Sequence, residues 1–363
     1  MRASFTASIL ALTLSACVGP RLMVRDTAAD YSVLNLSKSV APWEDGRRTP
    51  RDNRFYEWWY FDALLENGTT VVVWFGDNWF YGVEKRVVNI DLTPPGGPTR
   101  TVYKTWDEPG TFATDRADVR IGPHRFEGNL DRYTITVDPQ VHDGVGCAFT
   151  LVRTAPSWRP GTGYVAAGDD FFAWLPSVPN GEVTGTLTID GVTTEVRGSG
   201  YHDHNWGNVS PVDLMDSWWW GRANVGDRTF VISELRAKKR FGGGRIPLMY
   251  ASAPEALLVD AWGEGVHFEE AAAVQHPDPK HARPIGAAVT AIAPNGFKAT
   301  LPISTHLLTS ADLLSAFAGW QRWVAGAAGL KPWYSRFESD ASLTPPGEAP
   351  LTGRGTLEFF EFQ

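Results

Sequence analysis

The chain has 363 residues, of which 43% are hydrophobic and 20% are charged, and its formal net charge at pH 7 is -8. This composition supplies enough apolar side chains for a folded core and excludes an intrinsically disordered chain. The negative net charge and the lack of any basic block argue against nucleic acid as a partner. The 16 tryptophans are far more than a chain of this length ordinarily carries, and such rings fill a core or line a pocket for a flat apolar ligand.

Residues 1–17 have the features of a bacterial export signal. Arg2 is positive, the run from Phe5 to Leu14 is apolar, and Leu14-Ser15-Ala16-Cys17 resembles the bacterial lipobox. The resemblance implies cleavage before Cys17, which then carries acyl chains as a membrane anchor. An ordinary secretory signal or a short membrane anchor is the alternative, but the apolar run is too short to span a bilayer.

The lipobox resemblance also predicts where the protein resides. We expect a lipoprotein of the cell envelope that faces the periplasm and has the membrane as a partner. Val18 is not the aspartate that commonly retains lipoproteins at the inner membrane, which favours the outer membrane. Cys147 is the only other cysteine, so an acylated Cys17 leaves no internal disulfide.

The remaining chain has the pattern of an all-β protein. Residues 18–42 show no sustained period and are predicted to be a tether. Beyond them, short β-rich runs alternate with turn sequences. These turns are Asn67-Gly68, Pro95-Gly96-Gly97, Asn180-Gly181, Asp190-Gly191, Gly226-Asp227 and Asn295-Gly296. The pattern predicts antiparallel sheets closed into sandwiches or barrels, and the length indicates two β-domains, 43–210 and 211–363.

One segment has a helical period instead. Ser310 can cap a helix that continues to Ala328, and the apolar residues between them are spaced to share one face. We expect one added helix in the C-terminal half. It would cover a barrel end or, as the alternative, form a lid over an apolar ligand.

Two aromatic motifs carry a family resemblance. They are Glu57-Trp58-Trp59-Tyr60-Phe61-Asp62 and Tyr201-His202-Asp203-His204-Asn205-Trp206-Gly207, the latter followed by Ser217-Trp218-Trp219-Trp220-Gly221-Arg222. In this order they resemble the carotenoid 1,2-hydratase (hydroxyneurosporene synthase) family and its lipocalin-like relatives, which include secreted hydrolase-like proteins and Diels-Alderases. The resemblance implies two tandem lipocalin-like antiparallel barrels with an apolar ligand inside one barrel or between them. It also implies hydration of a terminal isoprenoid double bond, or cyclisation of a polyene, without an organic cofactor.

Strand geometry separates the first motif into two faces, with Glu57, Trp59 and Phe61 on one and Trp58, Tyr60 and Asp62 on the other. Aromatic rings on both faces predict that Glu57 or Asp62 meets an apolar wall. Desolvation then raises the pKa of the carboxyl and keeps it protonated, as the protonation of an alkene requires. The structural alternative is that Glu57 pairs with an arginine, with Arg222 as a candidate.

The second motif separates in the same way, with His202, His204 and Trp206 on one face and Tyr201, Asp203 and Asn205 on the other. A carboxylate beside imidazoles and an amide can position water and move protons, so Asp203, His204 and His202 are candidate proton-transfer groups. His204 and Trp206 also match the His-x-Trp element of the family's hydratases. The Tyr-x-Asp that accompanies it on a later strand is absent, and Glu234 could replace it only if its strand points inward.

The aromatic residues of the motifs are the predicted walls of the ligand site. The predicted ligand-binding residues are Trp58, Trp59, Tyr60, Tyr201, Trp206, Trp218, Trp219, Trp220 and Arg222. A metal is not expected, because His202 and His204 have chelating spacing but lack an evident third ligand. No Gly-x-Ser-x-Gly elbow or phosphate-binding loop is present.

Two functions remain open from the sequence. The first is a cofactor-independent hydratase or cyclase acting on an isoprenoid or polyene, with Asp203, Glu57 or Glu234 as the acid and tryptophan faces stabilising the cation. The second is a non-catalytic lipoprotein that carries an apolar small molecule in the envelope. A buried, unpaired carboxyl at the cavity favours the enzyme, whereas a cavity whose carboxyls are all ion-paired favours the carrier.

Replacing the predicted lipid-bearing cysteine tests the lipoprotein prediction. We expect Cys17→Ser to leave the protein unprocessed or to move it from the detergent phase to the aqueous phase, because the acylated sulfur is lost. Detergent partitioning and metabolic labelling with a fatty acid measure both effects. Wild-type protein that enters detergent without a labelled acyl chain would contradict the prediction.

Overall fold

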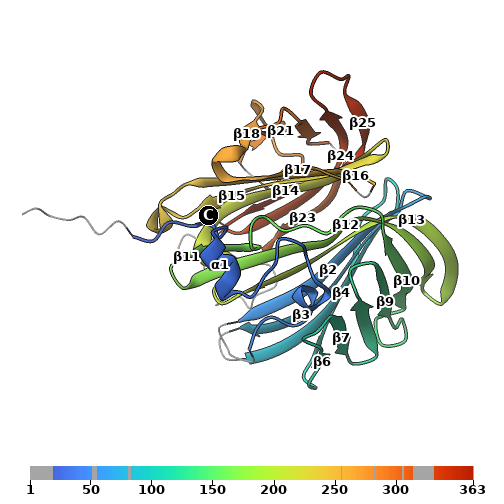
Figure 1. Ribbon diagram of the computed structural model, residues 1–363. Coiled ribbons are helices and arrows are strands. Elements are labelled where there is room, and N and C mark those ends of the chain that lie inside the picture. The colour runs from blue at the N-terminus through green and yellow to red at the C-terminus, as the bar shows by residue number, and fades with distance from the viewer. Residues whose placement is uncertain are drawn as a thin grey trace, which may run out of the picture.

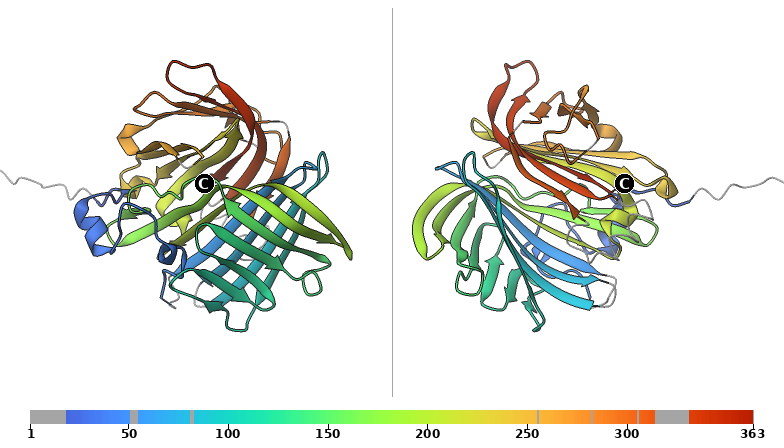
Figure 2. Two further views of the ribbon diagram at one scale, coloured as in Figure 1. Left: turned by 45° about the vertical axis from the view of Figure 1, so that its right-hand side comes forward. Right: turned by 180° about the vertical axis from the view of Figure 1, so that it is seen from behind.

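Two large, curved antiparallel sheets stack against each other in this protein (Figure 1). A computed structural model describes residues 19–50, 55–80, 83–254, 256–281, 283–304, 306–313 and 331–362. The predicted signal and Cys17 lie outside these residues. The sheets curl into two lipocalin-like half-barrels (Figure 2), which confirms the predicted all-β fold class. Within the described residues, the helices are too short or too polar to cross a membrane.

The first sheet is built from the first half of the chain, in the order β5-β4-β3-β2-β13-β12-β10-β9-β8-β7-β6. Its strands are β2 (Tyr56–Leu65), β3 (Thr70–Phe80), β4 (Val83–Thr93), β5 (Arg100–Trp106), β6 (Thr111–Phe112), β7 (Ala117–Ile121), β8 (His124–Gly128), β9 (Arg132–Val137), β10 (Val145–Arg153), β12 (Asp170–Ile189) and β13 (Val192–Gly207), with β11 (Tyr164–Ala167) beside β12. Alternate side chains of these strands fill the concave side with one apolar core that includes Trp59, Phe61 and Phe149.

The second sheet follows in the order β17-β16-β15-β14-β25-β24-β22-β21-β18. Its strands are β14 (Met215–Val225), β15 (Arg228–Ala237), β16 (Arg245–Ala253), β17 (Ala256–Trp262), β18 (His267–Glu270), β21 (Ala288–Ile292), β22 (Lys298–Pro302), β24 (Trp333–Thr344) and β25 (Leu351–Glu361), with β23 (Leu307–Asp312) beside β24. A separate pair is formed by β19 (Ala273–Val274) and β20 (Ile285–Gly286). The second sheet has its own apolar core, which includes Trp219, Phe337 and Phe359.

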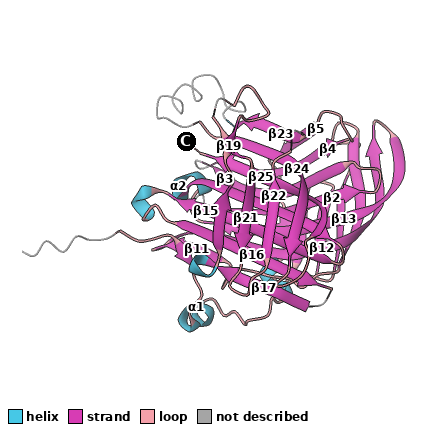
Figure 3. Cartoon of the chain, turned by 90° about the horizontal axis from the view of Figure 1, so that it is seen from above, coloured by secondary structure: helices cyan, strands magenta, loops and turns pink. Residues whose placement is uncertain are grey.

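Helical turns occupy the margins of the sheets, as Figure 3 shows. They are α1 (Ala28–Val33), α2 (Pro211–Leu214), η1 (Pro42–Asp45), η2 (Lys239–Phe241) and η3 (Gly263–Gly265). The short α2 stands between the end of β13 and the start of β14, so it joins the two sheets. Directly after α2, the start of β14 holds the C-terminus, because the Phe362 N–H donates to the Asp216 carbonyl at 2.9 Å.

The predicted turn sequences join strands in most places. Asp190 and Gly191 have φ values of 50° and 83° and close the hairpin between β12 and β13, as expected for a tight two-residue turn. Asn180-Gly181 is an exception, because it lies within β12 rather than in a turn. The pairing of β12 with β13 shifts register between Val178 and Gly181, so this sequence marks an irregularity inside a long strand.

The predicted helix does not begin at Ser310. Residues Leu307–Asp312 form strand β23, in which Ser310 pairs with Ser335 of β24. Pairing with an available sheet edge overrides the helical spacing here, because tertiary context outweighs local propensity. Residues 314–328 of the predicted helix lie outside the described residues.

The segment predicted as a tether is instead packed onto the body. Met23–Val24 form strand β1, which pairs with β11, and Thr27 caps α1 with a reciprocal capping box. The Tyr31 hydroxyl donates to the Gly161 carbonyl at 2.7 Å. The tether prediction is therefore wrong for this segment, because its elements are too short to show a period in the sequence.

Weakening the contacts of α1 tests this packing. We expect Tyr31→Phe to lower the free energy of unfolding by about 1 kcal/mol, since the Gly161 carbonyl loses its buried donor. Thr27→Ala should lower it by a further amount of about 1 kcal/mol through loss of the cap. Urea unfolding measures both changes. Val33→Ala is the control, because Val33 is 86% exposed on the same helix, and a tether would show no change in any variant.

Candidate functional site

The two motifs lie side by side, because β2 pairs with β13. Tyr60 stands opposite Asp203, and Trp59 stands opposite His204. The contacts confirm the predicted separation into two faces. One face points into the first half-barrel, where Trp59 lies in the apolar core. The other points toward the second sheet, where Tyr201 joins a cluster shared by both sheets.

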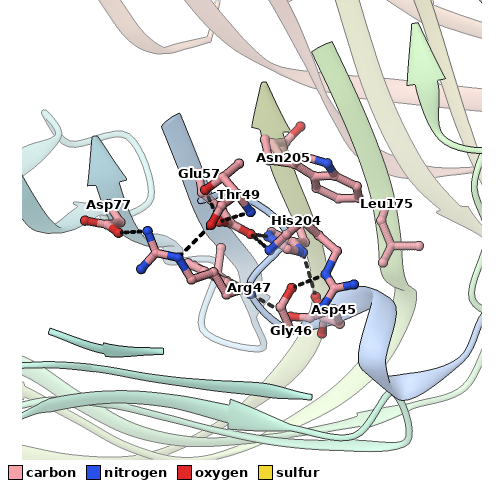
Figure 4. A network of polar contacts seen from close by, with 12 residues as sticks. Asp45, Gly46, Arg47, Thr49, Glu57, Asp77, Leu175, His204 and Asn205 are labelled. Carbon is pink, nitrogen blue, oxygen red and sulfur yellow. Dashed lines mark hydrogen bonds and ion pairs between the residues drawn. The ribbon is translucent and has the colours of Figure 1, made fainter. Parts of the chain in front are cut away.

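Glu57 is held on the interior face by a dense set of donors (Figure 4). Its carboxylate accepts from the Arg48 N–H at 2.6 Å, from the Thr49 hydroxyl at 2.6 Å and from His204 Nε2 at 2.8 Å. Arg222, the predicted partner, does not contact it. Glu57 thus anchors the loop after η1 inside the barrel.

His202 is locked into the same interior network. Its Nδ1 lies 2.8 Å from the Tyr60 carbonyl and its Nε2 lies 3.0 Å from the Asp45 carboxylate. Both ring nitrogens of His202 thus face an acceptor oxygen, which fixes the orientation of the ring. Burial raises the pKa of Asp45, but the nearby His202 and His204 and the Tyr133 hydroxyl outweigh burial and leave this pKa below its ordinary value. The two histidines therefore lie away from Asp203, on the opposite face of β13.

The face between the sheets is lined with aromatic rings. Trp218 contacts Phe360 with ring centroids 4.4 Å apart, and Trp220 packs against Tyr201 at 5.2 Å. The predicted wall residues on this face are Trp58, Tyr60, Tyr201, Trp218 and Trp220. The other predicted wall residues lie elsewhere: Trp59 lies in the first core, Trp219 in the second core, and Trp206 against Tyr164.

Asp203 is buried among these rings without a cationic partner. Its Oδ2 accepts from the Tyr201 hydroxyl and from Trp174 Nε1, each at 2.7 Å, and its Oδ1 accepts from Asn205 Nδ2 at 2.7 Å. These neutral donors lower the pKa, but burial outweighs them and raises the pKa of Asp203 to about 6. Asp203 is thus a carboxyl that can hold or release a proton near neutral pH.

Asp62 is on the same face but is permanently charged. It accepts from Arg222 and from Arg336 Nη2, the latter at 2.9 Å, and also from the Tyr60 hydroxyl at 3.1 Å. Burial raises the pKa of Asp62, but the two guanidiniums outweigh burial and lower the pKa below its ordinary value. Because Arg222 is on β14 and Arg336 is on β24, this carboxylate ties the two sheets together.

Glu358 is a second buried acid on this face, and the sequence analysis missed it. It lies on β25 opposite Arg336 of β24, with 3.0 Å between Arg336 Nη1 and Glu358 Oε1. Burial raises the pKa of Glu358 to about 7, although Arg336 opposes this shift. The available signal was a carboxylate among the alternating apolar residues of Leu357 to Phe362.

Glu234, the predicted substitute acid, does not join this site. It is fully buried on the face of β15 that points away from the first sheet. Its carboxylate accepts from Arg245 Nε at 2.5 Å and from Arg236 Nε at 2.9 Å. Glu234 therefore bridges two arginines of the second sheet and lies away from the aromatic face between the sheets.

A histidine beside a serine elsewhere does not form a hydrolytic pair. His276 Nε2 lies 2.9 Å from the Ser335 hydroxyl, while its Nδ1 accepts from the Asp278 N–H at 3.0 Å. The proton therefore resides on Nε2, so the ring donates to Ser335 and cannot take its proton. Within the described part of the chain, three or more His, Cys, Asp or Glu residues nowhere gather with metal-binding geometry.

Removing the charge of Asp62 tests its role between the sheets. We expect Asp62→Asn to lower the free energy of unfolding by about 3 to 5 kcal/mol, because two buried guanidiniums lose their counter-charge. The control is Asp190→Asn, which removes the exposed 2.9 Å pair with Arg100 and should cost less than about 1 kcal/mol. Chemical denaturation measures both. Equal losses in the two variants would show that Asp62 does not join the sheets.

Sequence comparisons relate this chain to carotenoid hydratases. Residues 99–243 match the family described as carotenoid hydratase CrtC, a stretch that contains the second motif but not the first. The chain is 30% identical over 213 residues to the hydroxyneurosporene dehydrogenase of Chlorobaculum tepidum, covering 46% of this chain. It is 24% identical over 245 residues to the quinolone epoxide rearrangement protein asqO of Emericella nidulans, covering 59% of this chain. The matched segments span 53% and 65% of those two relatives.

Structural comparisons find the same fold in proteins of low identity. A putative AttH from Nitrosomonas europaea has a TM-score of 0.60 at 16% identity, covering 89% of this chain and 97% of that one. CghA with Sch210972 has a TM-score of 0.61 at 14% identity, covering 89% of this chain and 96% of that one. Kievitone hydratase from Nectria haematococca has a TM-score of 0.60 at 14% identity, covering 94% and 97%. The structural matches confirm the lipocalin-like fold, and the sequence matches confirm that the chain resembles the carotenoid hydratases.

Proposed function

We propose that this protein is a cofactor-independent hydratase or cyclase that acts on a hydrophobic isoprenoid or polyene, with Asp203 as the proton donor. One observation carries the proposal. Asp203 is buried between the sheets without an arginine or lysine partner among the described residues, whereas Asp62 and Glu234 each contact two arginines. A carboxyl that stays partly protonated near neutral pH is the group that an alkene needs for protonation.

The surroundings of Asp203 suit this chemistry. The proton moves from the Asp203 carboxyl to one alkene carbon, which leaves a carbocation on the other carbon. The nearby face of Trp220 stabilises that charge, and Tyr201 and Asn205 hold the carboxylate that remains. In hydration, water attacks the cation and then loses a proton. In cyclisation, a second double bond of the substrate attacks the cation, and the new cation that forms loses a proton from a neighbouring carbon. The Asp203 carboxylate takes up this proton in either case.

The substrate class is inferred from the relatives. The matching family is described as carotenoid hydratase, and one relative is named hydroxyneurosporene dehydrogenase. Both names concern carotenoids, which are long apolar polyenes, and aromatic walls are the surfaces that such chains contact. With the predicted lipid anchor, we place the activity at the membrane surface of the cell envelope, where apolar substrates are dissolved.

The carrier hypothesis fits this face less well. A protein that only shelters an apolar molecule has no need of an unpaired carboxyl, and such a group costs stability when it is ionised. Asp203 and Glu358 both keep raised pKa values on this face. We therefore favour catalysis over carriage.

Replacing the proposed acid tests the proposal. We expect Asp203→Asn to lower turnover by about 10²- to 10⁴-fold, because the amide keeps the shape of the carboxyl but has no acidic proton. Deuterium uptake from D2O into carotenoid precursors that carry a terminal isoprenoid double bond reports both hydration and cyclisation. Binding of the same precursors should change little. Unchanged deuterium uptake in folded Asp203→Asn protein would exclude Asp203 as the acid.

The pH dependence provides a separate test. The pKa of Asp203 is about 6 in the folded protein, above the ordinary aspartate value of 3.8, so the folded state binds this proton more tightly than the unfolded state. Wild-type turnover should therefore fall as the pH rises above about 6. The ionised carboxylate should also cost stability above pH 6, and this cost should vanish below about pH 4.

Unfolding at two pH values then distinguishes an acid from a structural residue. At each pH, the free energy of unfolding of wild type is subtracted from that of Asp203→Asn. This difference should be up to about 3 kcal/mol larger at pH 8 than at pH 4. The difference between the two pH values isolates the ionisation, since the altered hydrogen bonds are common to both. A purely structural carboxylate would give the opposite sign, with a larger loss of stability at pH 8.

A further inference from the structure

The predicted lipid anchor lies next to a packed part of the chain. Cys17 is two residues from Gly19, which lies against the Arg240 carbonyl, and the Leu22 N–H donates to the Phe241 carbonyl at 3.1 Å. Two residues of fully extended chain span about 7 Å at most. If Cys17 is acylated, this end of the folded protein therefore lies against the membrane surface.

We propose that this end of the molecule is a membrane-docking face that lies on anionic phospholipid headgroups. It comprises residues 19–23, the turn 238–244 and the α2 segment 209–214, which are joined by direct contacts. The Lys238 N–H donates to the Leu214 carbonyl at 2.9 Å, and Arg240 Nη2 donates to the Asp213 carbonyl at 2.6 Å. Figure 1 shows the N-terminal segment and the C-terminus at this same end.

The charges on the docking face suit an anionic surface. Arg21, Lys239 and Arg240 are exposed, and Lys238 is half-buried. Asp213 is the acidic residue among them, and it lies 3.7 Å from Arg240. A local excess of positive charge stands out in a chain whose net charge is -8. Basic side chains near a bilayer are attracted to its anionic lipids.

Apolar side chains on the docking face suit the interfacial region of a bilayer. Met23 is 53% exposed between the basic residues. Leu22 and Phe241, which hold the segment in place, belong to the same apolar cluster as Trp218 and Phe360 of the face between the sheets. The docking face therefore continues directly into the aromatic wall of the proposed site.

Exposure decreases along this wall from the docking face inward. Trp58, Trp218 and Phe360 are half-buried near α2, whereas Trp220 is only 8% exposed one step further along β14. Asp203 is buried to a similar extent as Trp220 and is 6% exposed. An apolar chain that leaves the bilayer here would meet the half-buried rings first and the proton donor second.

The use of the docking face as a substrate entrance rests on the proposed function, but the docking itself does not. Vesicle binding tests the docking without any turnover. A chain that starts at Val18 is used, so that neither acyl chains nor the apolar signal masks the contribution of the surface. Its binding to vesicles of phosphatidylglycerol and phosphatidylcholine is compared with its binding to phosphatidylcholine alone.

Reversing two exposed charges gives the decisive comparison. We expect Arg21→Glu/Lys239→Glu to weaken binding to the phosphatidylglycerol vesicles by at least about tenfold. Arg197→Glu/Lys298→Glu is the matched control, because both residues are exposed near the opposite ends of the strands and the charge change is equal. This control should bind like the parent chain. Equal weakening by both pairs, or none by either, would overturn the proposal.

Amide hydrogen exchange on vesicles locates the face independently. Residues 19–23, 209–214 and 238–244 should gain protection when the acylated wild-type chain is in phosphatidylglycerol vesicles. The hairpin at Gly226 and the turn at Gly296 should exchange as in the free chain. Protection at these hairpins instead would place the membrane at the other end. Loss of turnover by the Arg21→Glu/Lys239→Glu chain in vesicles, with full turnover in detergent, would then tie docking to substrate delivery.

Discussion

The carboxylate of Asp62 between Arg222 and Arg336 is the constraint on which the relation of the two sheets depends. It joins β2 of the first sheet to β14 and β24 of the second. All three side chains are buried. The two ion pairs that they form are therefore costly to form, and breaking them costs still more stability. Apolar rings alone would tolerate sliding of one sheet over the other, whereas two guanidiniums on one carboxylate fix the register of the rings and of Asp203.

Strand alternation places Glu57 and Asp203 on opposite faces of the paired strands β2 and β13. In the interior, His204 Nε2 lies 2.8 Å from the Glu57 carboxylate, and this contact fixes β2 against β13. One residue along β13, Asp203 faces the second sheet and receives only neutral donors. Burial raises the pKa of Asp203 because neutral donors only partly offset it, whereas two guanidiniums lower the pKa of Asp62. Asp203 thus differs from Glu57 in the face that it occupies, and from Asp62 in having no guanidinium partner among the described residues.

The sequence predicts this alternation well, because the side-chain period of a strand is fixed and both motifs are long enough to show it. It predicts partners poorly, since Arg222 meets Asp62 rather than Glu57, and that choice depends on how two distant sheets stack. Glu358 was missed for the same reason, as its setting arises only when β25 pairs with β24. The packed segment before residue 42 was missed because β1 has only two residues, too few for any period.

The balance of charge between the sheets explains why a proton is available there. Asp62, Glu358 and Asp203 are three carboxyls, while Arg222 and Arg336 supply two guanidinium charges, and Asp62 takes one contact from each. Ionising both remaining carboxyls would leave a net negative charge in a dry, aromatic space, which is unfavourable at low dielectric. Burial raises the pKa of both groups, and at Glu358 the charges of Asp62 and Asp203 add to this shift. Arg222 and Arg336 hold the sheets together by binding Asp62, and neither of them pairs with Asp203. The arrangement that fixes the two sheets thus also keeps Asp203 available as an acid.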